Sequence, residues 1–205
     1  MNKVDLSVDV AGIKMNNPVT TASGTFGFGL DYLDYYDVNR LGAVTLKSIT
    51  REKRPGNLPP RIVETPAGIL NSIGLANPGL DQFIAGVIPE LEPVQIPILA
   101  SIAGDKVDDY VYLAEQLDSQ SKIAGIEVNI SCPNVKKGGL EFGVDAQQVE
   151  MLVREVRQAT RLPLIIKLSP NVTNIVKMAE AAVKGGADAL ALINTLLGMK
   201  IDVNS

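Results

Sequence analysis

The chain has 205 residues, of which 46% are hydrophobic and 20% are charged, so it is not a disordered polypeptide. Its formal net charge of −4 argues against a nucleic-acid-binding surface, which needs a basic face. A single cysteine excludes an intrachain disulfide, and neither a signal peptide nor a membrane-spanning apolar run is recognisable, which predicts a cytoplasmic protein without a membrane anchor. The chain has no histidine, so proton transfer falls to Cys, Lys, Tyr or a carboxylate.

Short apolar runs predict the strands. Near the N-terminus, Leu6, Val8 and Val10 alternate with polar residues, which predicts a small two-stranded plug. Continuous apolar runs are typical of buried parallel strands. Six such runs are residues 19–22, 43–46, 98–100, 125–128, 164–166 and 189–193. In the Pro- and Gly-rich loop of residues 50–80, residues 61–64 and 68–71 are expected to pair as a hairpin.

Two helical patterns lie between the later runs. The first follows Asp145 as N-cap, with Gln148 three residues on. Its expected apolar face consists of Val149, Leu152, Val153 and Val156. The second follows Thr173 and ends at Gly185 and Gly186. Its expected apolar face includes Ile175, Val176, Ala179 and Val183. Strands alternating with helices predict a parallel sheet.

A polar residue follows each of the last five runs. These residues are Lys47, Ser101, Asn129, Lys167 and Asn194. The C-terminal strand ends are where a (β/α)₈ TIM barrel builds its active site, although a doubly wound open sheet collects polar residues there too. The barrel is the favoured interpretation. We expect one domain over residues 1–205, with about six βα units of the eight that a barrel needs, and therefore C-terminally incomplete.

Three kinds of residue near these strand ends suggest chemistry. Cys132 lies among polar neighbours in a strand-end loop, which favours a reactive role over that of a buried structural cysteine. Lys47 and Lys167 are candidates to hold an anionic substrate, form a Schiff base or stabilise a reduced flavin. The amides of Asn71, Asn129, Asn134 and Asn194 suit a small planar ring, with turn formation as the alternative. No dinucleotide-binding glycine motif and no metal site is predicted.

Five motifs in order resemble those of the flavin-dependent dihydroorotate dehydrogenases of pyrimidine biosynthesis, in particular the class 1B catalytic subunit. They are residues 22–27 (ASGTFG), 70–79 (LNSIGLANPG), 129–139, 167–171 (KLSPN) and 193–195 (INT). The resemblance implies a (β/α)₈ barrel that holds FMN and oxidises dihydroorotate to orotate. Hydride passes to the flavin, and Cys132 is implied as the general base.

The resemblance also implies residue roles. The catalytic residues are Cys132, Lys47 and Lys167. The FMN contacts are Ser23, Lys47, Ser48, Asn129, Lys167 and Ile193, with Ser101 at a position where the family pattern leads us to expect an asparagine. The substrate contacts are Lys47, Asn71, Ile73, Gly74, Leu75, Asn129, Asn194 and Thr195.

The implied partner is an electron-transfer subunit that carries FAD and a [2Fe–2S] cluster and passes electrons to NAD⁺, in a heterotetramer built on a homodimer of this chain. One cysteine cannot ligate such a cluster in this chain. The family continues through two further strands, so we expect this chain to be a truncated form. The alternatives are a dihydropyrimidine dehydrogenase-like flavin barrel, a Schiff-base aldolase using Lys167, and an inactive truncated scaffold.

Overall fold

A computed structural model describes residues 4–131, 133–134 and 140–201 of the chain. Its centre is a parallel sheet of five strands in the order β11-β10-β7-β6-β3. These strands are β3 (Val44–Thr45), β6 (Ile98–Ile102), β7 (Gly125–Asn129), β10 (Leu164–Lys167) and β11 (Ala189–Ala191). All five coincide with predicted apolar runs. The remaining run, residues 19–22, contributes one parallel bridge, between Thr20 and Ala43, and forms no named strand.

The sheet is curled into part of a barrel. A cavity of about 470 Å³ on one face is lined by Thr20 at one edge of the sheet and by Ala191 at the other, and also by Glu127 and Ile165 of the central strands. A flat sheet would not bring both edges to one cavity. The α/β class and the partial parallel barrel that the sequence predicts are therefore confirmed.

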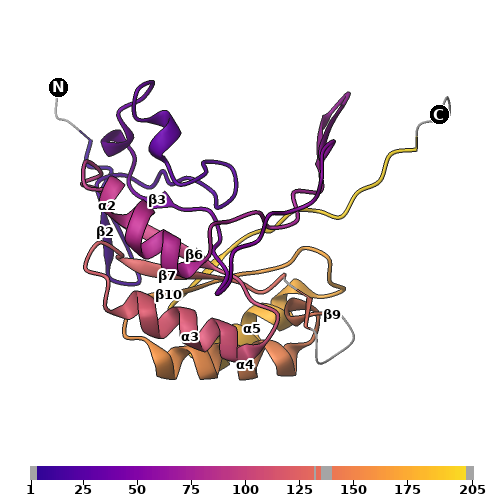
Figure 1. Cartoon of the computed structure of the whole chain (residues 1–205). Coiled ribbons are helices and arrows are strands. Elements are labelled where there is room, and N and C mark those ends of the chain that lie inside the picture. Colours follow the sequence, from indigo (N-terminus) through magenta and orange to yellow (C-terminus); the bar gives the residue numbers. More distant parts are fainter. Residues whose placement is uncertain (1–3, 132, 135–139, 202–205) are drawn as a thin grey trace.

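Three helices cover the outer face of the sheet, as Figure 1 shows. They are α3 (Val107–Asp118), α4 (Ala146–Ala159) and α5 (Ile175–Gly185). A further helical stretch packs beside β3 and β6 and consists of α1 (Leu80–Gln82), the π-helical η3 (Phe83–Val87) and α2 (Ile88–Glu90). Short 3₁₀ turns are η1 (Leu30–Tyr32), η2 (Val38–Arg40) and η5 (Phe142–Val144). No described helix is long and apolar enough to cross a bilayer.

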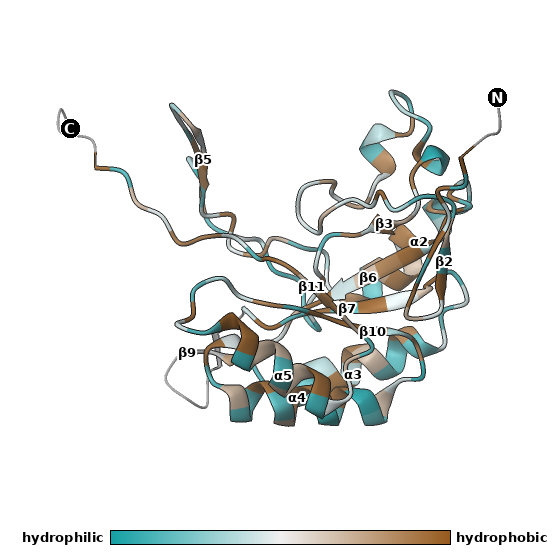
Figure 2. Cartoon of the chain, turned by 180° about the vertical axis from the view of Figure 1, so that it is seen from behind, coloured by the Kyte–Doolittle hydropathy of each residue, from teal (hydrophilic) through white to brown (hydrophobic). Residues whose placement is uncertain are grey.

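Three antiparallel pairs accompany the sheet. β1 (Val8–Val10) pairs with β2 (Ile13–Met15) as the expected N-terminal plug. β4 (Ile62–Thr65) pairs with β5 (Gly68–Asn71), which confirms the predicted hairpin. This hairpin rises away from the helix-covered face in Figures 1 and 2. The third pair is β8 (Pro133–Asn134) with β9 (Leu140–Glu141).

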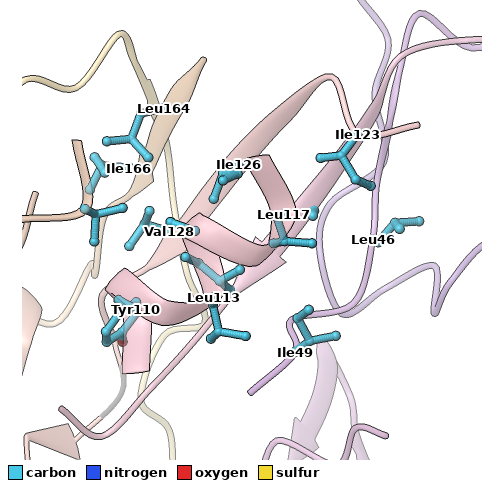
Figure 3. Packing of buried hydrophobic residues seen from close by; sticks show 14 of the residues in the cluster. Leu46, Ile49, Tyr110, Leu113, Leu117, Ile123, Ile126, Val128, Leu164 and Ile166 are labelled. Carbon is cyan, nitrogen blue, oxygen red and sulfur yellow. The ribbon is translucent and has the colours of Figure 1, made fainter. Parts of the chain in front are cut away.

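The main core lies between the sheet and the helices. Figure 3 shows Ile126 and Val128 of β7 packed against Leu113 and Leu117 of α3, and all four side chains are fully buried. Because side chains alternate along a strand, the residues between them face the inside of the curl. Glu127, Asn129 and Lys167 therefore point away from this core, toward the cavities on the inner face.

The helix predictions are confirmed for α4 and are partly wrong for α5. Val149, Leu152, Val153 and Val156 of α4 are fully buried, and the Asp145 side chain caps the helix by accepting from Gln147 N. In α5 the N-cap is Asn174 rather than Thr173. Val176 and Val183 are exposed, and the buried residues are Met178, Ala181, Ala182 and Gly185. Gly186 ends the helix in the left-handed conformation, as expected.

Candidate active site

A second cavity of about 470 Å³ lies at the C-terminal ends of the parallel strands. Its lining comes from the turn after Thr20, the ends of β3, β7 and β10, the hairpin and the segments that follow β5 and β11. Most of the predicted FMN and substrate contacts line it: Ser23, Lys47, Ser48, Asn71, Ile73, Gly74, Leu75, Asn129, Lys167, Asn194 and Thr195. The fold thus gathers residues separated by up to 172 positions, from Ser23 to Thr195, around one space.

Two lysines bring positive charge to this cavity. Lys167, the last residue of β10, is 7% exposed, and its Nζ donates to Ser23 Oγ at 2.9 Å. A Cβ placed on Gly24 would lie 3.8 Å from Lys47 Nζ. Both ammonium groups therefore reach the same Ser23-Gly24 turn. Gly24 has a φ of +84°, a conformation that glycine adopts without strain.

A buried carboxylate lies beneath Lys167. Glu127 Oε1 is 3.8 Å from Lys167 Nζ, and the two side chains are 7% and 9% exposed. Glu127 lines the apolar cavity inside the curl, whereas Lys167 lines both cavities and so lies between them. Glu127 is the only acidic residue in the described lining of the two cavities. The described lining of the cavity at the strand ends, called the upper cavity below, contains Lys47 and Lys167 and no acidic residue. The upper cavity is therefore positive and suits an anionic ligand.

The asparagines form a fixed amide pair. Asn194 Nδ2 donates to Asn129 Oδ1 at 2.8 Å, and Ser131 N donates to the same oxygen at 3.1 Å. These bonds occupy the carbonyl oxygen of Asn129, so its NH₂ group is the part that can donate to a ligand. The hydroxyl of Tyr110 donates to the backbone oxygen of Asn129 at 2.8 Å and holds the strand end from the helix side.

Asn77 organises the loop that follows the hairpin. It accepts from Thr50 N at 3.1 Å and from Gly79 N at 2.9 Å, and donates to Leu75 O at 2.8 Å. Leu75 has a φ of +55°, which is strained for a leucine and is the kind of conformation that clusters at ligand sites. A Cβ on Gly74 would lie 2.7 Å from Asn57 N, so only glycine fits there. The loop therefore holds Ile73, Gly74 and Leu75 at the cavity wall.

Some predicted residues lie elsewhere. Ser101 is fully buried, and its Oγ lies 2.7 Å from Ser48 Oγ, so it touches the cavity lining only through Ser48. Ile193 lines the apolar cavity below. Asn134 belongs to β8, and its side chain lies outside the described part of the structure. Cys132 lies outside the described residues. Among the described residues, no group of three or more Asp, Glu, Cys or His could hold a metal ion.

Sequence patterns do not single out three residues of this region. Glu127 interrupts an otherwise apolar run, and that interruption is the only signal that marks it. Asn171 donates through Nδ2 to Thr195 O at 3.3 Å and accepts from Leu197 N at 3.0 Å, and so holds the segment after β11. Asn77 is mostly buried and satisfies several backbone groups. Asn77 and Asn171 lie within the family-like motifs, but their bonding is visible only in three dimensions.

Comparison with known proteins identifies relatives along the whole chain. The family model described as dihydroorotate dehydrogenase matches residues 5–205. Three similar curated proteins are each named dihydroorotate dehydrogenase B (NAD(+)), catalytic subunit. The relative from Geotalea uraniireducens is 54% identical over 203 residues, which are 99% of this chain and 67% of the relative. The relative from Desulforudis audaxviator is 53% identical over 201 residues, 98% of this chain and 66% of the relative. The relative from Thermoanaerobacter pseudethanolicus is 46% identical over 202 residues, 98% of this chain and 67% of the relative.

The chain thus spans about two thirds of the length of these relatives. The motifs, the partial barrel and the positive cavity at its strand ends agree with that match. On this evidence the chain belongs to the dihydroorotate dehydrogenase family.

Proposed function

We propose that this chain forms the catalytic part of an NAD-linked dihydroorotate dehydrogenase, which oxidises dihydroorotate to orotate in pyrimidine biosynthesis. The observation that carries the proposal is the single cavity in which two lysines and three asparagines converge from separate strand ends and loops. The names of the curated relatives point to the same reaction.

The described residues fit FMN. The turn at Ser23 and Gly24 offers backbone without a bulky side chain, and Lys47 and Lys167 both end beside it. Positive charge near a flavin ring stabilises the negative charge that the ring gains on reduction. FMN, when bound, supplies the acceptor for the hydride from C6 of the substrate.

The chain's own groups hold the substrate and take its proton. The NH₂ group of Asn129, held by the bond from Asn194, donates to an oxygen of the dihydropyrimidine ring. Lys47 and the amide of Asn71 line the same cavity and are assigned to the anionic and imide edges of the substrate. Cys132 is assigned as the general base that removes the C5 proton, on the basis of its family motif. The hairpin and the loop of Ile73, Gly74 and Leu75 form a wall that limits access of water.

The proposal includes a partner. Electrons leave through an electron-transfer subunit with FAD and a [2Fe–2S] cluster, which delivers them to NAD⁺, and this chain forms the homodimeric centre of a heterotetramer in the cytoplasm. What supports this partner is the name "catalytic subunit" of the curated relatives.

The experiment is reconstitution of the purified chain with FMN, followed by anaerobic addition of dihydroorotate. We expect the bound flavin to lose its visible absorbance as orotate forms in equal amount. Lys167→Met should weaken FMN binding by at least about tenfold, because it removes a buried charge and its bond to Ser23. Lys184→Met, at an exposed position of α5, is the matched control. A chain that binds FMN but leaves dihydroorotate unchanged, and instead reduces uracil, would identify the dihydropyrimidine dehydrogenase-like alternative.

A further inference from the structure

We propose, on the basis of the function above, that Glu127 is a positioning residue: it holds the ammonium group of Lys167 in place and offsets part of the positive charge that Lys47 and Lys167 present to the flavin. Neither the motifs nor the relatives' names assign it a role.

The placement of Glu127 is unusual for a carboxylate. Its neighbours in β7, Ile126 and Val128, pack in the main core, and its partners across the sheet are Ile165 of β10 and Ser101 of β6. The residue is only 5% exposed, and Oε1 accepts no hydrogen bond from the described part of the chain. Buried charges are costly unless they are paired and hydrogen-bonded, so a residue of this kind is more readily explained by function than by stability.

The contact with Lys167 gives that function. The distance of 3.8 Å from Oε1 to Nζ is an ionic contact and too long for a hydrogen bond. The same Nζ donates to Ser23 Oγ at 2.9 Å. A lysine side chain has four rotatable bonds, and here its end is held from two sides, by the strand β7 below and by the turn at Ser23. Glu127 therefore fixes where the Lys167 charge lies.

Glu127 also lowers the net positive charge of the group that it forms with Lys47 and Lys167. Lys47 and Lys167 line the upper cavity, and Glu127 is the only acidic residue in the described lining of either cavity. The formal charges of Lys47, Lys167 and Glu127 sum to one positive charge. Replacing Glu127 by an uncharged residue raises this sum to two. An additional positive charge near a bound flavin would favour the reduced, anionic ring. Glu127 thus limits how strongly the site favours reduced flavin, which keeps electron release to the next acceptor favourable.

The first arm of the test uses the flavin. Glu127→Gln keeps the shape and removes the charge, and Glu115→Gln, at an exposed position of α3, is the matched control. The FMN-loaded proteins are equilibrated with a reference dye at fixed potential. We expect the ratio of reduced to oxidised flavin to rise at least about fivefold in Glu127→Gln and to stay unchanged in Glu115→Gln. Glu127→Asp, which retains the charge, should stay within about twofold of the original protein.

The second arm needs no cofactor. The cofactor-free chain is acylated with acetic anhydride, and Lys167 is quantified by peptide mapping relative to the exposed Lys184 of the same sample. The ionic contact with Glu127 at 3.8 Å and the bond to Ser23 hold the Lys167 ammonium group in the interior, away from the reagent. Glu127→Gln removes the ionic contact and frees the side chain to move, so we expect labelling of Lys167 to rise at least about fivefold. If the Gln variant does not fold, Glu127→Leu, an uncharged residue suited to the apolar cavity, takes its place in both arms.

The two arms separate this inference from the proposed function. If the chain binds no FMN, the proposed function fails, while the acylation arm still decides whether Glu127 controls Lys167. If the uncharged variants match Glu115→Gln in both arms, Glu127 is a packing residue and the inference is overturned. A changed melting temperature with an unchanged flavin ratio and unchanged labelling would overturn it in the same way.

Discussion

Individual residues explain why this site is only partly predictable. Lys47, Asn129 and Lys167 stand out in the sequence as polar residues at the ends of apolar runs, and the structure brings all three to one cavity. Glu127 escapes the same pattern because its run is otherwise apolar, although its side chain faces inward between core residues. The bond between Asn129 and Asn194 joins residues 65 positions apart, and no local pattern encodes it.

At the same scale, Cys132 can be tested directly. Cys132→Ser should lower turnover at least about tenfold at neutral pH and leave the flavin bound, because a serine hydroxyl is a much weaker acid than a thiol of pKa about 8.5 and does not supply an anionic base. Stopped-flow reduction by dihydroorotate measures the proton-coupled step. Flavin content and melting temperature serve as controls, and an undiminished rate of reduction would remove Cys132 from this role.

At the scale of elements, apolar runs locate the strands well but do not orient α5. The five strands of the sheet lie in predicted runs, because strands buried on both faces need continuous apolar sequence. In α5 the prediction places Val176 and Val183 on the buried face, and this is wrong because both are exposed. The buried face holds the smaller Ala181, Ala182 and Gly185, because α4 approaches closely. A Cβ on Gly185 would lie 2.7 Å from Val153 Cβ, so small residues determine the packing there.

The packing of α4 on α5 gives a matched pair of substitutions. Val153 is fully buried, whereas Val176 is 62% exposed. Val153→Ala should lower the free energy of unfolding by about 2 kcal/mol, since it removes two buried methyl groups and leaves a cavity. Val176→Ala should change it by less than about 0.5 kcal/mol. Urea denaturation measures both, and equal effects would contradict the observed orientation of α5.

Asp118 links the end of α3 to the turn before β10. Its Oδ1 accepts from Thr160 Oγ1 and from Arg161 N, both at 2.6 Å. The bond from the Thr160 hydroxyl, followed by the bond from the Arg161 amide, lowers the pKa of the Asp118 carboxyl. A carboxyl whose pKa is lowered on folding stabilises the fold above its unfolded pKa of about 3.9, and this stabilisation is lost as pH falls through the lower folded value.

The corresponding prediction is a pH-dependent loss. Asp118→Asn should lower the free energy of unfolding by about 1 kcal/mol at pH 7, a modest value because Asp118 is exposed to solvent, and the deficit should shrink as pH falls below about 4. Asp34→Asn, at an exposed position near η1, is the control. Denaturation curves at several pH values measure the difference. A deficit that stays constant down to the lowest pH would show that the charge of Asp118 is not its source.

At the scale of the whole molecule, the class and the curl of the sheet follow from the order of strands and helices, whereas the two cavities do not. The lower cavity is apolar and is enclosed by the N-terminal plug, with Ile13 and Met15 buried against Leu99 and Ile165. The upper cavity is polar and positive. Lys167 lines both cavities, so a ligand in the upper cavity contacts a residue that is also packed in the interior of the fold.

This coupling predicts that the cofactor stabilises the fold. A ligand that binds only the folded chain, at about 100 times its dissociation constant, adds about 2.7 kcal/mol, which for a chain of this size raises the melting temperature by about 5 to 10 °C. We expect FMN to produce that shift in differential scanning fluorimetry. Riboflavin, which lacks the phosphate, tests how much of the shift arises from the ring site that we propose beside Lys47, Lys167 and Ser23. Lys167→Met should lose most of the shift while Lys184→Met retains it, and an equal shift in both variants would place the flavin away from this cavity.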